Sequence, residues 1–96
     1  MKLSNEDIMA IREYFRDKPV LKAFLFGSFS RGEALNDSDI DILVKFKETI
    51  SLLELVHIHR ELSALLGKRV DLITEQAVKN KRIKKYIYDD LQIIFE

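Results

Sequence analysis

The chain has 96 residues and a formal net charge of zero, with 47% hydrophobic and 33% charged residues. This length and composition indicate one globular domain spanning residues 1–96, and the neutral balance argues against strong nucleic-acid binding through broad electrostatic attraction. The lack of cysteine excludes disulfides and thiolate zinc sites. No apolar run reaches the length of a membrane span, so we expect a cytoplasmic protein with no membrane partner.

The first part of the chain predicts a helix, a strand and a short helix. Ser4 followed by Asp7 is typical of a helix N-cap, and apolar residues then recur at helical spacing as far as Phe15. The apolar run from Val20 to Phe26 predicts a strand. A short helix is expected from Ser28 to about Ala34, and a polar loop follows it.

The clearest strand signal runs from Asp39 to Phe46, where apolar side chains alternate with mostly polar ones. Such alternation sends successive side chains to opposite faces of a sheet. One face is expected to carry Ile40, Ile42, Val44 and Phe46, and the other Asp39, Asp41, Leu43 and Lys45.

The second part of the chain predicts two helices and two strands. An amphipathic helix is expected from Ser51 to Leu66 with Gly67 as its C-cap, and a strand from Arg69 to Thr74 follows it. A helix around Ala77 to Asp89 and a strand near Gln92 to Phe95 complete the chain. The buried stripe of the first of these helices is predicted to comprise Leu52, Leu55, Val56, Leu62, Leu65 and Leu66.

These elements predict an α/β fold with a small mixed sheet flanked by α-helices. The first strand ends at a glycine turn and the second begins at an aspartate pair, so the two strands must run antiparallel for these features to share a site. The long helix between the second and third strands suits a right-handed parallel crossover. That crossover would bring Asp71 to the edge of the sheet where Asp39 and Asp41 lie.

A Gly-Ser pair follows the first predicted strand. Gly27 permits a tight turn and lets a ligand approach the backbone, and the helix that begins there favours an anion. Ser28 adds a hydroxyl that can donate to a phosphate oxygen. The alternative is an ordinary strand-to-helix turn in which Ser28 is the N-cap.

Asp39 and Asp41 are expected on one face of a strand, and two carboxylates so close repel unless a cation lies between them. Mg²⁺ suits such a site because it takes oxygen ligands and is commonly shared with substrate phosphates. The alternative is an aspartate-rich strand start that caps backbone groups, but Ile40 and Ile42 fix the strand register and favour the metal site. A calcium-binding EF-hand loop is excluded, because Ile42 stands where that loop requires glycine.

Asp71 lies in an otherwise apolar predicted strand, where a charge is costly without a partner. One interpretation is a third carboxylate that binds metal and takes the proton from an attacking hydroxyl. The other is an ion pair with Lys68 or Arg69. The predicted topology favours the first.

Two groups of basic residues keep open roles. Arg31 could neutralise phosphate charge from the short helix, or it could pair with Glu33 or Asp37. The basic run from Lys79 to Lys85 is interpreted as a solvated helix face, with contact to an acidic partner or to phosphates as the alternative.

The pattern of Gly27-Ser28, ten further residues and then Asp39-Ile40-Asp41 resembles the signature of the DNA polymerase beta-like nucleotidyltransferase superfamily. The residues from Arg31 to Ala34, together with Ser38, resemble its small stand-alone members, the minimal nucleotidyltransferase (MNT) domains. The resemblance covers essentially the whole chain and implies the nucleotidyltransferase fold.

The resemblance implies an Mg²⁺-dependent enzyme that moves a nucleoside monophosphate, AMP from ATP, to an acceptor hydroxyl, with two Mg²⁺ ions in the site. Asp71 would match the third carboxylate of the family and would align and deprotonate that hydroxyl. The implied nucleotide-binding residues are Gly27, Ser28 and Arg31, and the implied metal-binding and catalytic residues are Asp39, Asp41 and Asp71.

The resemblance also implies a partner. Many MNT proteins of this size resemble antitoxins paired with a HEPN-type ribonuclease toxin, and some are thought to add AMP to that toxin. We therefore expect such a toxin as the acceptor. We also expect the chain to form a homo- or hetero-oligomer. A second hypothesis is a non-catalytic binding module of the same fold, and a third is the subunit of an enzyme that modifies antibiotic-like small molecules. The presence of all three aspartates favours an active enzyme.

Overall fold

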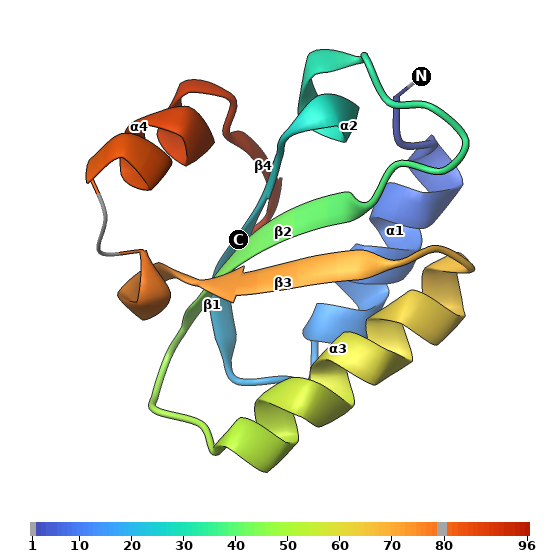
Figure 1. Cartoon of the computed structure of the whole chain (residues 1–96). Helices are drawn as coiled ribbons and strands as arrows, with labels where there is room; N and C mark the ends of the chain where they lie inside the picture. The colour runs from blue at the N-terminus through green and yellow to red at the C-terminus, as the bar shows by residue number, and fades with distance from the viewer. Residues whose placement is uncertain (1, 79–80) are drawn as a thin grey trace.

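The fold is a four-stranded sheet with helices on both faces (Figure 1). The computed structural model describes residues 2–78 and 81–96. Within these ranges, no helix is both long enough and apolar enough to cross a membrane. The elements are α1 (Asn5–Phe15), β1 (Val20–Phe26), α2 (Ser28–Arg31), β2 (Ile40–Phe46), α3 (Leu52–Leu66), β3 (Val70–Thr74), the 3-10 helix η1 (Glu75–Ala77), α4 (Lys81–Asp89) and β4 (Gln92–Phe95).

The sheet has the strand order β3-β2-β1-β4 and is mixed, which confirms the predicted topology. β1 pairs antiparallel with β2 and places Phe26 opposite Asp41. β2 pairs parallel with β3 and places Asp41 beside Asp71. β4 pairs antiparallel with the other side of β1. As a result, β2 lies between the strand that leads into the glycine turn and the strand that carries Asp71.

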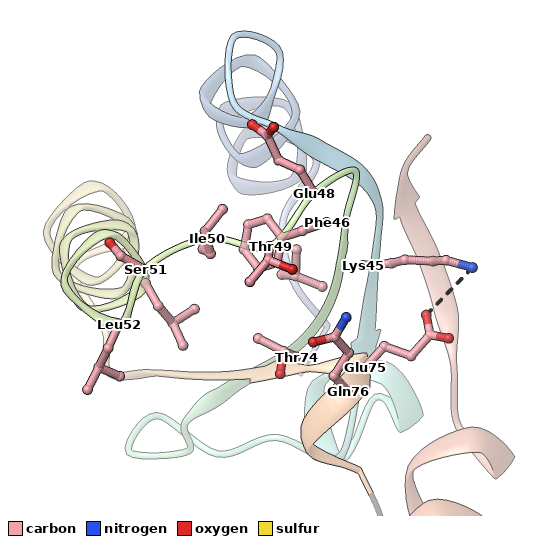
Figure 2. Close-up of a pocket in the computed structure, with 12 residues that line it drawn as sticks. Lys45, Phe46, Glu48, Thr49, Ile50, Ser51, Leu52, Thr74, Glu75 and Gln76 are labelled. Atoms are coloured by element: carbon pink, nitrogen blue, oxygen red, sulfur yellow. Dashed lines mark ion pairs between the residues drawn. The ribbon is translucent and has the colours of Figure 1, made fainter.

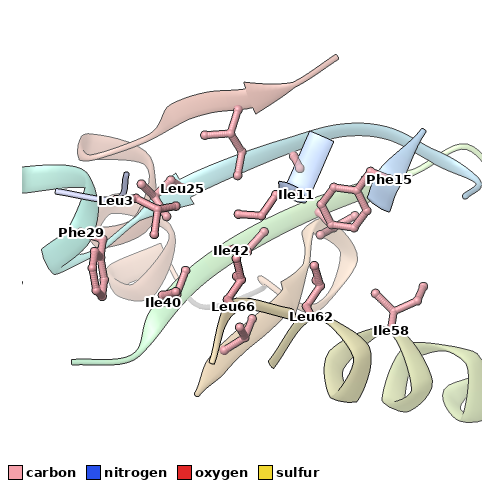
Figure 3. Close-up of a cluster of buried hydrophobic side chains, with 14 of the residues drawn as sticks. Leu3, Ile11, Phe15, Leu25, Phe29, Ile40, Ile42, Ile58, Leu62 and Leu66 are labelled. Atoms are coloured by element: carbon pink, nitrogen blue, oxygen red, sulfur yellow. The ribbon is translucent and has the colours of Figure 1, made fainter. Parts of the chain in front are cut away.

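Two hydrophobic clusters hold β2 in place, one on each face of the sheet. Ile40 and Ile42 are fully buried in the cluster that includes residues of α1 and α3 (Figure 3). Leu43 points to the other face, where it packs with Phe26 and with Ile87 of α4. Burial of each such side chain contributes on the order of 1.5–3 kcal/mol. The predicted alternation of β2 is therefore confirmed, and both faces oppose a shift of its register.

Side-chain caps set the helix boundaries. The hydroxyl of Ser4 accepts a hydrogen bond from the N–H of Asp7 at 3.1 Å, as predicted for the start of α1. The hydroxyl of Ser51 accepts one from the N–H of Glu54 at 3.1 Å, so α3 begins one residue after its predicted start. Gly67 ends α3 in the left-handed conformation, with φ of 65°, and is the predicted C-cap.

Two predicted helices are shorter in the structure. The first, α2, stops before Gly32, because this residue adopts the left-handed conformation and ends the helix short of Ala34. The second, predicted from Ala77 to Asp89, is replaced by η1 followed by α4, and residues 79 and 80 lie outside the described residues. The strands β2 and β3 each begin one residue later than predicted.

The buried stripe of α3 is narrower than predicted. Its buried residues are Ile58, Leu62 and Leu66, which are spaced four apart. Residues at this spacing form one narrow line along a helix, and this line alone faces the core, so the flanks of the predicted stripe face solvent. The prediction was therefore wrong for Leu52, Val56 and Leu65, which are exposed. Leu55, also predicted to be buried, is only partly buried.

The narrow stripe predicts that alanine substitutions at two leucines three residues apart lower the free energy of unfolding by different amounts. Leu62 is fully buried and Leu65 is 49% exposed. We expect Leu62→Ala to lower the free energy of unfolding by about 2–5 kcal/mol, because it leaves a cavity under the sheet. Leu65→Ala should lower it by less than about 1 kcal/mol. Urea unfolding of both variants measures the difference, and equal losses would contradict the observed orientation of α3.

Candidate active site

The site begins at the turn between β1 and α2. Gly27 has φ of 73° and ψ of −154°, and its carbonyl accepts hydrogen bonds from the N–H groups of Ser30 and Arg31, both at 3.1 Å. A Cβ atom on this residue would collide with Oδ2 of Asp41. Glycine is therefore required here twice, for its backbone conformation and for the close approach of an aspartate from the next strand.

The sheet brings the three predicted carboxylates together. Asp41 is the parallel-strand neighbour of Asp71, and Asp39 precedes Asp41 by two residues. Residues two apart on a strand, and residues paired across strands, point to the same face. All three aspartates thus lie at the edge of the sheet where the Gly27 turn also lies, and this placement agrees with the predicted one. Their catalytic and metal-binding roles stay predictions.

The environment of these carboxylates is suited to a cation. Burial, then the negative charges of Asp71 and Asp39, raise the pKa of Asp41 to about 6. Oδ1 of Asp39 is buried and has no hydrogen-bond partner among the described residues. An oxygen of this kind and a carboxyl group that resists ionisation both gain stability when a divalent cation binds, so the donor set fits Mg²⁺.

The carboxylates do not form a closed metal shell by themselves. In the described ranges, no three acidic or histidine side chains converge as a ready-made metal site. The guanidinium of Arg69 lies 3.0 Å from Oδ1 of Asp39, without the geometry of a hydrogen bond. This arginine is 81% exposed, so a metal ion can displace it into solvent at little cost. Phosphate oxygens and water would supply the remaining ligands.

The two alternatives proposed for Ser28 and Asp71 receive no support. Ser28 is the first residue of α2 and not its N-cap, which is Gly27. Asp71 is exposed, and its two expected partners are engaged elsewhere: Lys68 donates to the carbonyl of Asn36 at 3.2 Å, and Arg69 lies against Asp39.

Arg31 lies at the end of α2 among groups from two parts of the chain. Its Nε donates to Glu33 at 3.1 Å, one of the two partners expected from the sequence, and the other expected partner, Asp37, is not among its contacts. Its Nη1 donates to Asp90 at 2.8 Å, and its guanidinium lies 5.8 Å from the ring centre of Tyr86. The sequence carries no signal for the Asp90 contact, because the two residues are 59 positions apart.

Two other features lie away from this cluster. A cleft of about 350 Å³ opens at the opposite end of β2, between the segment that leads into α3 and the start of η1 (Figure 2). Lys45 and Glu75 form an ion pair of 3.9 Å at its wall, and none of the predicted site residues lines it. In the predicted basic run, Lys81, Lys84 and Lys85 are exposed on α4, and the run's first two residues lie outside the described residues.

Comparisons with known proteins agree with this geometry. Residues 8–94 match the family model described as Nucleotidyltransferase domain. A Methanocaldococcus jannaschii protein, provisionally named a protein adenylyltransferase, is 43% identical over 81 residues, which cover 84% of this chain and 80% of that protein.

Two solved structures share the fold. One, provisionally described as a minimal nucleotidyltransferase, is 32% identical with a TM-score of 0.74, and the match covers 94% of this chain and 95% of the other. The second is a chain in the complex of a tri-AMPylated Shewanella oneidensis HEPN toxin with MNT antitoxin. It is 20% identical with a TM-score of 0.74, and the match covers 96% of this chain and 71% of the other.

The raised pKa of Asp41 predicts a pH-dependent effect of Asp41→Asn on the metal-free protein. The folded pKa of about 6 exceeds the ordinary value of 3.8, so the folded state binds more protons between these values and the wild type loses stability as the pH rises through them. An asparagine stays neutral. The variant should therefore gain stability over the wild type between pH 4 and pH 6 and keep the gain above pH 6.

We expect a gain of about 1 kcal/mol, because solvent screens this partly buried group. Melting temperatures in EDTA across the pH range measure it. Asp37→Asn, at an exposed position of the preceding loop, controls for the loss of one negative charge. A gain that is the same at pH 4 and pH 7 would contradict the raised pKa of Asp41.

Proposed function

We propose that this chain, which belongs to the nucleotidyltransferase domain family, transfers AMP from ATP to a hydroxyl group of a protein. One observation carries the proposal: Asp41 of β2 lies against the glycine turn that follows β1, beside Asp71 of the parallel strand β3 and two residues after Asp39. The name of the M. jannaschii relative supports AMP as the transferred group and a protein as the acceptor.

The turn at Gly27 would receive the triphosphate. The glycine has no side chain, and the first N–H groups of α2 have no acceptor within the helix, so a phosphate can approach the backbone closely. The Ser28 hydroxyl and the Arg31 guanidinium would donate further hydrogen bonds to phosphate oxygens. These contacts hold the triphosphate with its α-phosphorus toward the aspartates.

Asp39 and Asp41 would hold Mg²⁺, for which the buried Oδ1 of Asp39, which accepts no hydrogen bond from the described residues, and the raised pKa of Asp41 are the structural support. When bound, Mg²⁺ offsets the negative charge on the reacting phosphoryl group. Asp71, which is exposed at the edge of the sheet, would accept the proton of the acceptor hydroxyl. The hydroxyl oxygen then forms a bond to the α-phosphorus, the bond from that phosphorus to the bridging oxygen breaks, and pyrophosphate leaves.

A HEPN-type toxin is the acceptor that we propose to test. In the complex that shares this fold, the HEPN toxin carries AMP and is bound to MNT antitoxin. The exposure of Asp71 supports an acceptor that reaches the site from outside, because a protein hydroxyl must approach the carboxylates across an open edge.

The decisive experiment uses ATP labelled at its α-phosphate, Mg²⁺, and a purified HEPN-type toxin. We expect label on the toxin. The double variant Asp39→Asn, Asp41→Asn should lower the rate at least about a hundredfold, the scale seen when a charge-stabilising group is lost. Asp37→Asn removes a nearby exposed carboxylate and should label the toxin at the wild-type rate.

Two results would contradict the proposal. If the wild type and the double variant neutralise the toxin equally and no label is transferred, the chain is a binding module. If label appears on an aminoglycoside-type small molecule and not on protein, the acceptor class is wrong.

A further inference from the structure

The turn between α4 and β4 is bonded to α2, although the two segments are far apart in the sequence (Figure 1). The carboxylate of Asp90 accepts a hydrogen bond from Nη1 of Arg31 at 2.8 Å, and its backbone carbonyl accepts one from the hydroxyl of Ser30. Tyr86 of α4 adds its ring beside the guanidinium. Three contacts thus join the C-terminal part of the chain to the helix that follows the Gly27 turn.

The ion pair with Asp90 is better shielded than the other ion pair of Arg31. The side chains of Arg31 and Asp90 are 31% and 22% exposed, whereas that of Glu33 is 67% exposed. Exposed ion pairs contribute little, because water and salt compete with them. The charge-assisted hydrogen bond to Asp90 is shorter and less exposed than that to Glu33, at 2.8 Å against 3.1 Å, so Asp90 contributes more to where the guanidinium lies.

We infer that Asp90 is a positioning residue for nucleotide binding: it fixes the guanidinium of Arg31 beside the carboxylates, so that the C-terminal turn forms part of the triphosphate site. The inference rests on the proposed function, in which Arg31 meets the triphosphate. Arg31 lies near enough to the carboxylates for its charge to act against the rise in the pKa of Asp41.

The contact leaves Arg31 able to bind phosphate. A guanidinium has five N–H donors. Glu33 takes the one on Nε and Asp90 takes one on Nη1, so neither contact uses Nη2. A free arginine side chain loses rotamer freedom when it binds a ligand, and the Asp90 contact removes most of that freedom beforehand. ATP should therefore bind more tightly with Asp90 than without it.

The test is the affinity for α,β-methylene-ATP with Mg²⁺, measured by calorimetry, because this analogue cannot release AMP. We expect Asp90→Asn to weaken binding about tenfold, and Asp90→Glu to weaken it less because the charge is kept. Asp89→Asn makes the same chemical change at the exposed neighbouring residue and should change affinity less than about twofold. In transfer assays, Asp90→Asn should raise the KM for ATP more than it lowers kcat.

A double-mutant cycle separates positioning from a general effect on folding. In an Arg31→Gln background, Asp90→Asn should change the affinity no further, because it acts only through the guanidinium. If Asp90→Asn does not fold, the comparison of Asp90→Glu in the two backgrounds decides instead.

Three results would overturn the inference: wild-type affinity in Asp90→Asn, tighter binding in that variant, or the same loss in both backgrounds. Tighter binding would mean that Asp90 holds Arg31 away from the phosphates. Because the analogue reports binding without transfer, a chain that binds it normally and transfers no AMP contradicts the proposed function alone.

Discussion

The register of β2 between β1 and β3 is the constraint on which the rest of the structure depends. Ile40 and Ile42 are buried on one face and Leu43 on the other, so a slip by one residue would turn the two isoleucines out of their cluster and turn the aspartates into it. The apolar packing stabilises an arrangement that the carboxylates oppose, since burial and then their mutual repulsion raise the pKa of Asp41. Core packing thus offsets an electrostatic cost that a bound cation would lower.

The same register explains the shape of the site. Antiparallel pairing brings the Gly27 turn over Asp41, and parallel pairing brings Asp71 beside it. In the proposed function the Gly27 turn binds phosphates and the carboxylates bind metal, while the side of Asp71 remains open. An acceptor that arrives on a second protein accounts for this openness. In the inference drawn from the Asp90 contact, the C-terminal turn completes the nucleotide side through Arg31.

Much of the fold, and with it the placement of the site, could be predicted because the strand signals are local in the sequence. The limits of β1 and β4, the mixed sheet and the two faces of β2 follow from apolar runs and from alternation, and the structure confirms them. Contacts that depend on tertiary packing could not be predicted. The pair of Arg31 and Asp90 spans 59 positions, and Arg69 lies against Asp39 and not against Asp71, with which the sequence suggested it could pair.

The width of the buried stripe of α3 also could not be predicted from the sequence, because its leucines fit helical spacing whether or not a neighbouring element covers them. Only the line through Leu62 meets the core, while Leu52 and Leu65 face solvent. Likewise, a glycine within a predicted short helix can either continue or end it, and the structure shows that Gly32 ends α2 in the left-handed conformation, with φ of 76°.

The central claim is that one metal-binding edge is built from three separate segments, the Gly27 turn, the start of β2 and Asp71 of β3. Line broadening by substoichiometric Mn²⁺ in the amide NMR spectrum of the full chain tests it most directly. The account predicts that the signals of residues 27–29, 39–41 and 71 broaden first and together. Broadening that starts at the cleft beside Lys45 and Glu75, or that spares Asp71 and the Gly27 turn, would contradict it.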